Sequence, residues 1–254
     1  MAFEGATNDD GIWQARGGAG EALVVLLHGL AANAAVFHGL APLIAASGRR
    51  WIAPDFRGHG RSVLRGPYGY GVHAADVAQL LAGENPETTI VLGHSFGGVI
   101  GGLLGSGLYG PPPARVVGLG VKLDWSEEET AGARRLAAKP PKLFATFEEA
   151  AEHALRIAGL AGLVDPRSDV AAHGVVSREG GFAAAFDPAA FGAVGPSVDA
   201  IMRGCAAPLT LAAGARDTMV GPEAMRRIDA NAVVLPDLGH NAHVEAPEAV
   251  MRLL

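Results

Sequence analysis

Short runs of apolar and β-branched residues recur along the chain, separated by stretches with helical character. The runs lie at 23–27, 51–53, 88–92, 115–121, 208–212 and 232–235. Continuous apolar runs of this length fit strands that are covered on both faces, as in parallel sheets. Helical candidates lie between them, at 73–81 and 96–108. The alternation predicts an α/β domain with a mostly parallel sheet flanked by helices.

The alternation breaks between about Asp124 and Arg203, where the pattern is helical. Two stretches, 126–129 and 146–149, match the capping box, in which a hydroxyl and a carboxylate satisfy free backbone donors at a helix start. Asp165-Pro166 offers a third helix start. We therefore expect one domain over residues 1–254, with an inserted helical lid at about 124–203.

Composition narrows the possible functions. Hydrophobic residues make up 49% of the chain and charged residues 18%, which is typical of a globular protein. The formal net charge is −6, and the absence of a dense Lys/Arg run argues against nucleic-acid binding. No apolar stretch approaches the length of a membrane span, and residues 1–11 lack a signal-peptide pattern. These features predict a soluble, cytoplasmic protein, and they say nothing about its oligomeric state.

One motif carries a specific chemical prediction. Gly93-His94-Ser95-Phe96-Gly97 follows a predicted strand and precedes a predicted helix, which is the context that gives the pattern G-x-S-x-G its meaning. In that context the serine lies on a sharp turn, with its hydroxyl above the carboxyl end of the sheet. The motif therefore predicts that Ser95 is a nucleophile.

A serine hydroxyl needs a base, and the base needs a group that orients it. Asp217 and His240 each follow a predicted strand, in the chain order serine, acid, histidine that accompanies this motif. We therefore predict a catalytic triad of Ser95, Asp217 and His240. Asp124 is the alternative acid, because it follows the run at 115–121. Asp124 and Trp125 are otherwise candidates for the substrate pocket or for the start of the lid.

Acyl transfer also requires donors for the oxyanion. The expected donors are the backbone N–H groups of Phe96, directly after the nucleophile, and of Leu30, in the loop after the first long strand. His243, three residues after His240, could share a helix face with it and form a metal pair, but no third ligand with suitable spacing is evident. We therefore interpret His243 as a packing residue or one that supports the site from behind. The G-x-G-x-x-G pattern at 105–110 follows a helix rather than a strand, so it does not predict a dinucleotide site. No metal or organic cofactor is expected.

Together these segments resemble the α/β-hydrolase superfamily, in single-domain members with a helical cap. The resemblance rests on 28–29, 55–62, 93–98, 214–217 and 239–240. It implies a central eight-stranded sheet with one antiparallel strand near the N-terminus. We expect residues 11–17 to form the first hairpin of this sheet. It also implies the triad of Ser95, Asp217 and His240.

A serine at the nucleophile position is typical of family members that cleave esters and thioesters. We therefore expect hydrolysis of a small-molecule carboxylic ester or thioester through an acyl-enzyme on Ser95. Two alternatives remain open: hydrolysis of a carbon–carbon bond, and noncatalytic binding of a small ligand by a receptor of this fold.

Overall fold

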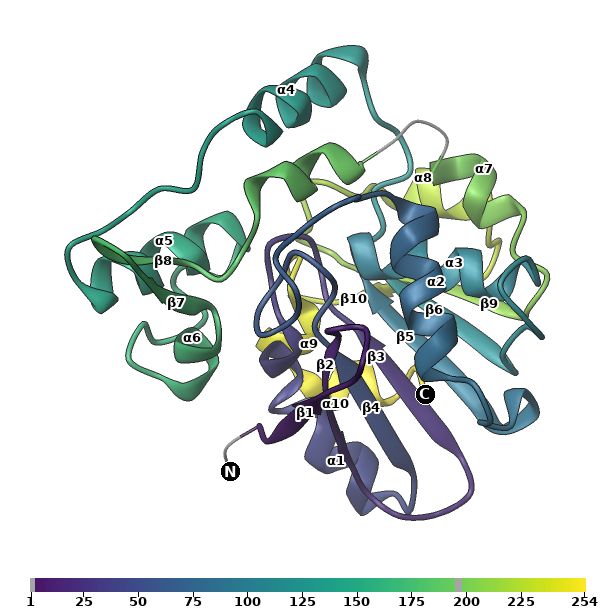
Figure 1. The fold of residues 1–254 in the computed structure, drawn as a ribbon. Helices are drawn as coiled ribbons and strands as arrows, with labels where there is room; N and C mark the ends of the chain where they lie inside the picture. The colour runs from purple at the N-terminus through teal and green to yellow at the C-terminus, as the bar shows by residue number, and fades with distance from the viewer. Residues whose placement is uncertain (1–2, 195–197) are drawn as a thin grey trace.

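The computed structural model describes residues 3–194 and 198–254. Eight strands form one sheet in the order β1-β2-β4-β3-β5-β6-β9-β10 (Figure 1). Its strands are β1 (Gly5–Thr7), β2 (Trp13–Gly17), β3 (Leu23–Leu27), β4 (Arg50–Pro54), β5 (Thr89–His94), β6 (Arg115–Leu119), β9 (Leu209–Gly214) and β10 (Val233–Leu235). Strand β2 is antiparallel to β1 and β4, and the other neighbours are parallel. The α/β-hydrolase fold with its mostly parallel sheet is therefore confirmed.

The N-terminal hairpin differs from its prediction. Strand β2 lies within the expected stretch 11–17, but its partner β1 precedes that stretch. The turn lies between them, because the side chain of Asn8 accepts hydrogen bonds from the amides of Asp10 and Ile12. Gly11 completes the turn with φ +79. Asn and Gly at these positions are turn signals, and they could have moved the predicted hairpin toward the N-terminus.

Alternate residues of the central strands build two separate cores. Val24 and Leu26 of β3 pack on one side, whereas Leu23, Val25 and Leu27 pack on the other. This alternation is the period of two expected for a strand buried on both faces. The first face is covered by α1 (Leu40–Ala46) and α10 (Pro247–Met251), and the second by α2 (Tyr70–Leu80) and α3 (Phe96–Gly105).

The stretch 124–203 is more varied than the predicted run of helices. It contains α4 (Glu127–Ala137), α5 (Phe147–Ile157), α6 (Asp169–His173), a hairpin of β7 (Val175–Arg178) and β8 (Gly181–Ala184), the short helix η3 (Pro188–Ala193) and α7 (Val198–Arg203). Both predicted capping boxes are present, at the starts of α4 and α5. The purely helical prediction is wrong at the β7–β8 hairpin, whose Val175, Val176 and Phe182 suit strands.

Two boundaries of this stretch also differ. Helix α6 begins after Ser168 rather than at Asp165-Pro166, because Asp165 forms a turn that accepts the Ser168 amide at 3.0 Å. Helix α7 packs on α3, and a Cβ on Gly102 would lie 2.7 Å from the sulfur of Met202. Since α7 covers the sheet, we refer to residues 124–193 below as the insertion.

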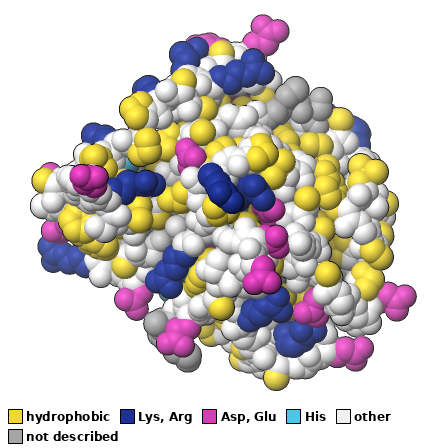
Figure 2. Space-filling view, viewed as in Figure 1, with side chains coloured by type: hydrophobic (Ala, Val, Ile, Leu, Met, Phe, Trp, Pro, Cys, Tyr) yellow, Lys and Arg dark blue, Asp and Glu magenta, His cyan; other side chains and the backbone are white. Residues whose placement is uncertain are grey.

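The insertion is anchored to the sheet domain at its hairpin end. Nε2 of His173 lies 2.7 Å from Oδ2 of Asp55, and both side chains are buried. The amide of Gly60 donates to the carbonyl of Ala185 at 2.7 Å. Helix α4 is different, because none of its residues is buried. Acidic and basic side chains both point to solvent at the top of the molecule, where α4 lies (Figures 1 and 2). The insertion is thus held at one end and solvated at the other.

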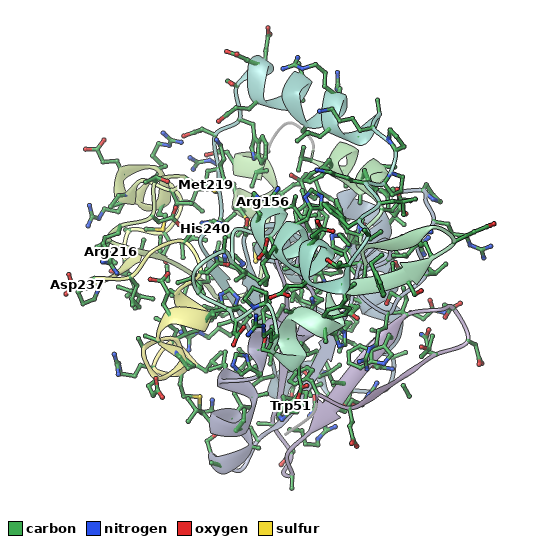
Figure 3. All side chains as sticks on the ribbon, turned by 90° about the vertical axis from the view of Figure 1, so that its left-hand side faces the viewer. Trp51, Arg156, Arg216, Met219, Asp237 and His240 are labelled. Atoms are coloured by element: carbon green, nitrogen blue, oxygen red, sulfur yellow. The ribbon has the colours of Figure 1, made fainter. Side chains whose placement is uncertain are left out.

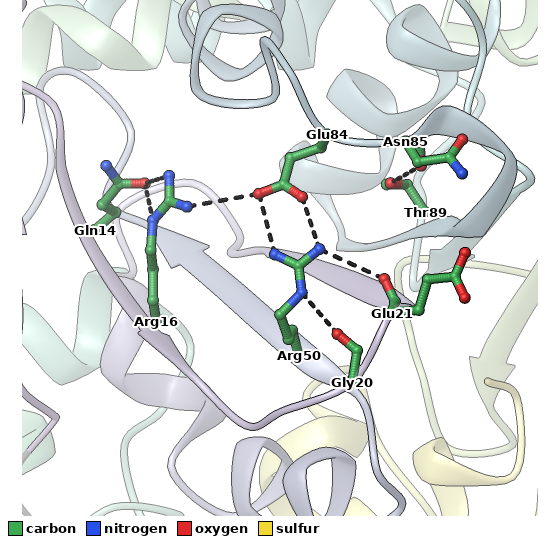
Figure 4. Close-up of polar contacts among 8 residues, drawn as sticks. All are labelled: Gln14, Arg16, Gly20, Glu21, Arg50, Glu84, Asn85 and Thr89. Carbon is green, nitrogen blue, oxygen red and sulfur yellow. Dashed lines mark hydrogen bonds and ion pairs between the residues drawn. The ribbon is translucent and has the colours of Figure 1, made fainter.

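Charged residues at the amino end of the sheet form a compact paired cluster (Figure 4). The guanidinium of Arg50, at the start of β4, donates to both carboxylate oxygens of Glu84, at 2.8 and 3.2 Å. Arg16 reaches the same carboxylate at 3.7 Å, and Nε of Arg50 donates to the carbonyl of Gly20. The cluster ties together the loops that precede β3 and β5. Across the described residues, no helix has the length and apolar character that crossing a bilayer requires.

Candidate active site

Ser95 lies on a sharp turn between β5 and α3. Its φ of +50 and ψ of −113 are rarely adopted by residues with a side chain. The Ser95 amide donates to the carbonyl of Leu119 at 2.8 Å, which ties the turn to β6. A Cβ on Gly93 would lie 2.2 Å from the carbonyl oxygen of Gly97, and one on Gly97 would lie 2.2 Å from that of Leu27. The glycines of the motif are therefore required by close backbone contacts.

Asp217 and His240 meet in the loops after β9 and β10. Nδ1 of His240 lies 2.8 Å from Oδ2 of Asp217, whose side chain is fully buried. The other carboxylate oxygen of Asp217 accepts the amide of Met219 at 2.8 Å. An ionised carboxylate only accepts hydrogen bonds, so Nδ1 of His240 carries the proton in this pair. Nε2 of the neutral ring is then free to accept a proton.

Asp124, the alternative acid, lies elsewhere. Both of its carboxylate oxygens accept a hydrogen bond from Arg227 at 2.7 Å, and its side chain is 66% exposed. Strand β6 does end near His240, because a Cβ on Gly120 would lie 3.3 Å from the imidazole ring. The chain then turns away, which carries Asp124 to the surface. The carboxylate that contacts the histidine is that of Asp217.

A cavity of about 270 Å³ opens over the serine. Ser95, His240 and both predicted oxyanion residues line it, and so does Trp125 from the start of the insertion. The remaining wall comes from the sheet domain and from the insertion, and includes Gly29, Tyr70, His94, Val99, Lys122, Arg156, Ile157, Ala158, Gly159, Phe191, Val194 and Met219. Figure 3 shows Arg156, Met219 and His240 near one another at this cavity, with Trp51 distant at the amino end of β4.

A second cavity of about 430 Å³ lies beneath α4. It shares two wall residues, Ile157 and Phe191, with the cavity over the serine. Its other lining is mostly apolar, with Lys139 and Lys142 among the polar exceptions. The two side chains of Ile157 and Phe191 thus form a partition between the two cavities.

The predicted oxyanion donors are available. Leu30 follows β3, and Phe96 is the first residue of α3, where a backbone N–H has no partner within the helix. Within the part of the chain that the structure describes, neither amide donates to another protein group. Both residues line the cavity over Ser95. Two free N–H groups beside a serine hydroxyl are what a developing oxyanion needs.

His94 connects the turn of Ser95 with the loop of His240, a contact that the sequence pattern did not predict. Its Nε2 donates to the carbonyl of His240 at 3.0 Å. Burial, together with the neighbouring His243 and His240, holds the pKa of His94 well below its usual value. The ring of His243 packs on that of His94 with centroids 4.3 Å apart. Burial lowers the pKa of His243 to about 3, so this pair stays neutral beside His240.

Glu245 is a second contact that the sequence did not reveal. Its two carboxylate oxygens accept the amide of Gly239 at 2.9 and 3.0 Å, directly before His240. Arg216 lies 3.8 Å from Glu245 and also donates to the carbonyl of Asp237. Figure 3 places Arg216 and Asp237 side by side, next to the His240 loop. The only signal in the sequence was a carboxylate six residues after Gly239, a spacing with no general meaning.

No group of three or more His, Cys, Asp or Glu side chains among the described residues is arranged to hold a metal ion. The site as described consists of a strained serine, a paired histidine and two free amides, which together suit nucleophilic attack on a carbonyl carbon.

Comparisons with known proteins agree with the fold. The lipase LipV of Mycobacterium tuberculosis is 34% identical over 90 residues, which span 34% of this chain and 33% of the lipase. The pimeloyl-acyl-carrier protein methyl ester esterase of Edwardsiella ictaluri is 36% identical over 102 residues, or 40% of this chain and 36% of the esterase. The matches thus span about a third of the length of these relatives.

Among solved structures, the thioesterase domain from the curacin biosynthetic pathway superposes with a TM-score of 0.81 at 18% identity. The alignment covers 100% of this chain and 99% of that domain. At this identity the likeness concerns the fold alone. The profile of the alpha/beta hydrolase family matches residues 24–253, and the chain therefore belongs to the alpha/beta hydrolase family.

Proposed function

We propose that this protein is a serine hydrolase that cleaves a carboxylic ester or thioester of a small molecule through an acyl-enzyme on Ser95. The observation that carries the proposal is the 2.8 Å contact between His240 and the buried Asp217, together with a cavity that His240 and Ser95 both line. Ester-cleaving relatives, among them a lipase and a methyl ester esterase, support the same type of reaction.

In the first half of the reaction, Oγ of Ser95 attacks the carbonyl carbon while Nε2 of His240 takes the hydroxyl proton. Asp217 keeps the imidazole in the required tautomer and stabilises its protonated form. Because Asp217 is fully buried beside His240, its negative charge acts through little solvent. The alcohol or thiol then leaves with the proton from His240, and the acyl group stays on Ser95.

The N–H groups of Leu30 and Phe96 hold the oxyanion in this step. Loss of one such donor typically lowers kcat by about 10²–10³-fold. In the second half, His240 takes a proton from water, which attacks the acyl-enzyme, and the serine regains its proton as the acid leaves. The same groups therefore act twice, with acid and base roles exchanged.

A fluorophosphonate probe tests the proposal, because it reacts with activated serines. We expect an adduct on Ser95, located by peptide mass spectrometry, which is lost in Ser95→Ala and His240→Ala. His38→Ala is the matched control, since His38 is exposed and does not line the cavity over the serine. A panel of p-nitrophenyl esters and S-acyl thioesters then measures turnover.

The outcomes separate the alternatives. Labelling of Ser95 without turnover of any ester or thioester would favour carbon–carbon bond hydrolysis, which a dienone acid substrate would test. A folded wild-type protein that is neither labelled nor active would overturn the proposal and direct attention to stoichiometric ligand binding.

A further inference from the structure

The charged side chains of the cavity over Ser95 are unbalanced. Lys122 and Arg156 are among the described residues that line it, whereas no aspartate or glutamate is. The rest of the lining is mainly apolar, apart from Ser95, the two histidines and Tyr70. This local excess of positive charge occurs in a protein whose formal net charge is −6.

Lys122 does not contribute a free charge. Its ammonium group forms an ion pair with Glu129, in the first turn of α4, and only 18% of its side chain is exposed. It also lies 5.2 Å from the centre of the Trp125 ring, in a cation–π contact. Lys122 is therefore neutralised and held in place by the start of the insertion.

Arg156 is not neutralised in this way. Among the described residues, no carboxylate lies within ion-pair distance of its guanidinium. In the part of the chain that the structure describes, its one side-chain hydrogen bond goes from Nη1 to Nδ1 of His153, at 3.2 Å. Arg156 lies in the last turn of α5, where a cation also complements the helix dipole. The interaction with the helix dipole explains why a positive charge is found at this position. It does not explain why the side chain lines the cavity.

We propose that Arg156 binds a carboxylate of the substrate, so that the ester or thioester cleaved at Ser95 is a small, negatively charged molecule. This inference rests on the proposed function and adds the chemical class of the substrate. A guanidinium presents its N–H groups in a planar fork that matches the two oxygens of a carboxylate. The cavity of about 270 Å³ limits such a molecule to a small size.

A carboxylate fits this charge better than a phosphate monoester. A phosphate monoester carries about −1.5 to −2 charges at neutral pH, whereas a carboxylate carries one. Because Glu129 already neutralises Lys122, Arg156 supplies a single unpaired positive charge at the cavity. A carboxylate carries one negative charge, so the pair with Arg156 has no net charge.

The test compares anionic esters with neutral esters of the same shape. One pair carries the charge on the acyl side, as mono-4-nitrophenyl adipate and its terminal amide. The second pair carries the charge on the alcohol side, as the hexanoyl esters of 4-hydroxybenzoate and 4-hydroxybenzamide. The quantity measured is the ratio of kcat/KM for the acid to kcat/KM for the amide. We expect a ratio of about ten or more in at least one pair, the size of effect that a charge-assisted hydrogen bond produces.

Three variants test whether Arg156 causes the preference for the acid over the amide. Arg156→Met is expected to lower the ratio about tenfold, because it removes the charge and the fork. Arg156→Lys keeps the charge without the fork and should restore part of the ratio. Arg167→Met is the matched control, since Arg167 is also in the insertion but pairs with Glu148 at 3.0 Å and does not line the cavity. Its ratio should equal that of the wild type.

Failure of this inference differs from failure of the proposed function. Hydrolysis of both members of each pair at equal rates, or a ratio that Arg156→Met leaves unchanged, would overturn the role of Arg156 while ester hydrolysis stands. If no ester is turned over, the same four compounds are titrated into Ser95→Ala. If Ser95→Ala binds the acid and the amide with equal Kd, the inference is overturned independently of catalysis. The same holds if adding Arg156→Met to Ser95→Ala leaves the ratio of the two Kd values unchanged.

Discussion

Two arginines at opposite ends of the central sheet differ in their partners. At the amino end, Arg50 and Arg16 converge on Glu84, and Arg50 also holds the carbonyl of Gly20 (Figure 4). At the carboxyl end, Arg156 lines the cavity over Ser95 without a carboxylate partner among the described residues. The first arrangement satisfies its charges internally and stabilises loops. The second leaves a charge for a molecule that is not part of the protein.

The two ends of the sheet also differ in their backbone conformation and in their buried side chains. Strands at the amino end start from loops joined by ion pairs, whereas the carboxyl end holds Ser95 at φ +50 and a set of buried histidines. In open α/β sheets, ligands bind outside the carboxyl ends of the strands. The comparison indicates that the strained serine and the unpaired arginine lie together at the end of the sheet where ligands of such folds bind.

The largest expected effect is on kcat, and it distinguishes Asp217 from Asp124 as the acid that orients His240. Asp217→Asn should lower kcat for an ester substrate by about 10⁴-fold, because the amide no longer fixes the tautomer of His240 or stabilises its charge. Asp124→Asn, at an exposed aspartate paired with Arg227, should change kcat by less than about twofold. Steady-state kinetics of the two variants would contradict the assignment if Asp124→Asn had the larger effect.

A substitution in the strained turn should reduce stability as well as activity. Gly97→Ala places a Cβ 2.2 Å from the carbonyl oxygen of Leu27, so the backbone must move. We expect a loss of about 2–3 kcal/mol in the free energy of unfolding, measured by urea denaturation. Gly221→Ala is the control, because nothing lies within 4 Å of the added carbon. Equal midpoints for both variants would show that the turn tolerates a side chain.

The two ends of the sheet should also contribute to the pH dependence of the free energy of unfolding in different pH ranges. Burial lowers the pKa of His28 to about 4 and that of His243 to about 3, from an ordinary value of 6.5. Their neutral forms contribute full stability above pH 6.5, and this contribution is lost as pH falls toward the folded pKa, because the unfolded chain binds the protons. Each such proton changes the free energy of unfolding by about 1.4 kcal/mol per pH unit. His243→Leu should therefore give a shallower dependence between pH 6 and about 4, and an unchanged slope would refute this account.

The smallest effect concerns the amino end. Hydrogen bonds from Arg50 lower the pKa of Glu84 below its ordinary value of 4.5, so the pair stabilises the fold above that pH. Glu84→Gln should cost about 1 kcal/mol or less at pH 7, since the pair is partly exposed to solvent. The difference from the wild type should vanish as pH falls below 4.5, and kcat/KM at neutral pH should not change. A loss of activity would show that the two ends are coupled.

The sheet and the position of the candidate nucleophile could be predicted because each depends on local signals. Every apolar run became a strand, and the position of Ser95 follows from the glycines that flank it. The contact between Asp217 and His240 follows from parallel strands that end at one edge. The chain order favoured Asp217 over Asp124, and the contact agrees, whereas the surface position of Asp124 depends on where the chain turns after β6.

The insertion was less predictable because its structure depends on distant contacts. His173 and Asp55, which anchor it, are 118 residues apart in sequence. The β7–β8 hairpin lacks a long alternating pattern. Single bridges join Phe182 of β8 to Phe144, and Phe186 after β8 to His59. The place of Arg156 at the cavity follows only once α5 is docked. The candidate catalytic residues were thus visible in the sequence, whereas the residue proposed to choose the substrate was not.

The distribution of one residue type has a practical consequence for chemical modification. Lys122, Lys139 and Lys142 are all the lysines of the chain. They lie beside the cavity over Ser95 or in the second cavity beneath α4. Reagents that acylate lysine amines will therefore report on these two cavities, and cross-links between lysines will measure distances there and nowhere else in the fold. Coupling the lysines to a support would tether the protein through the same region.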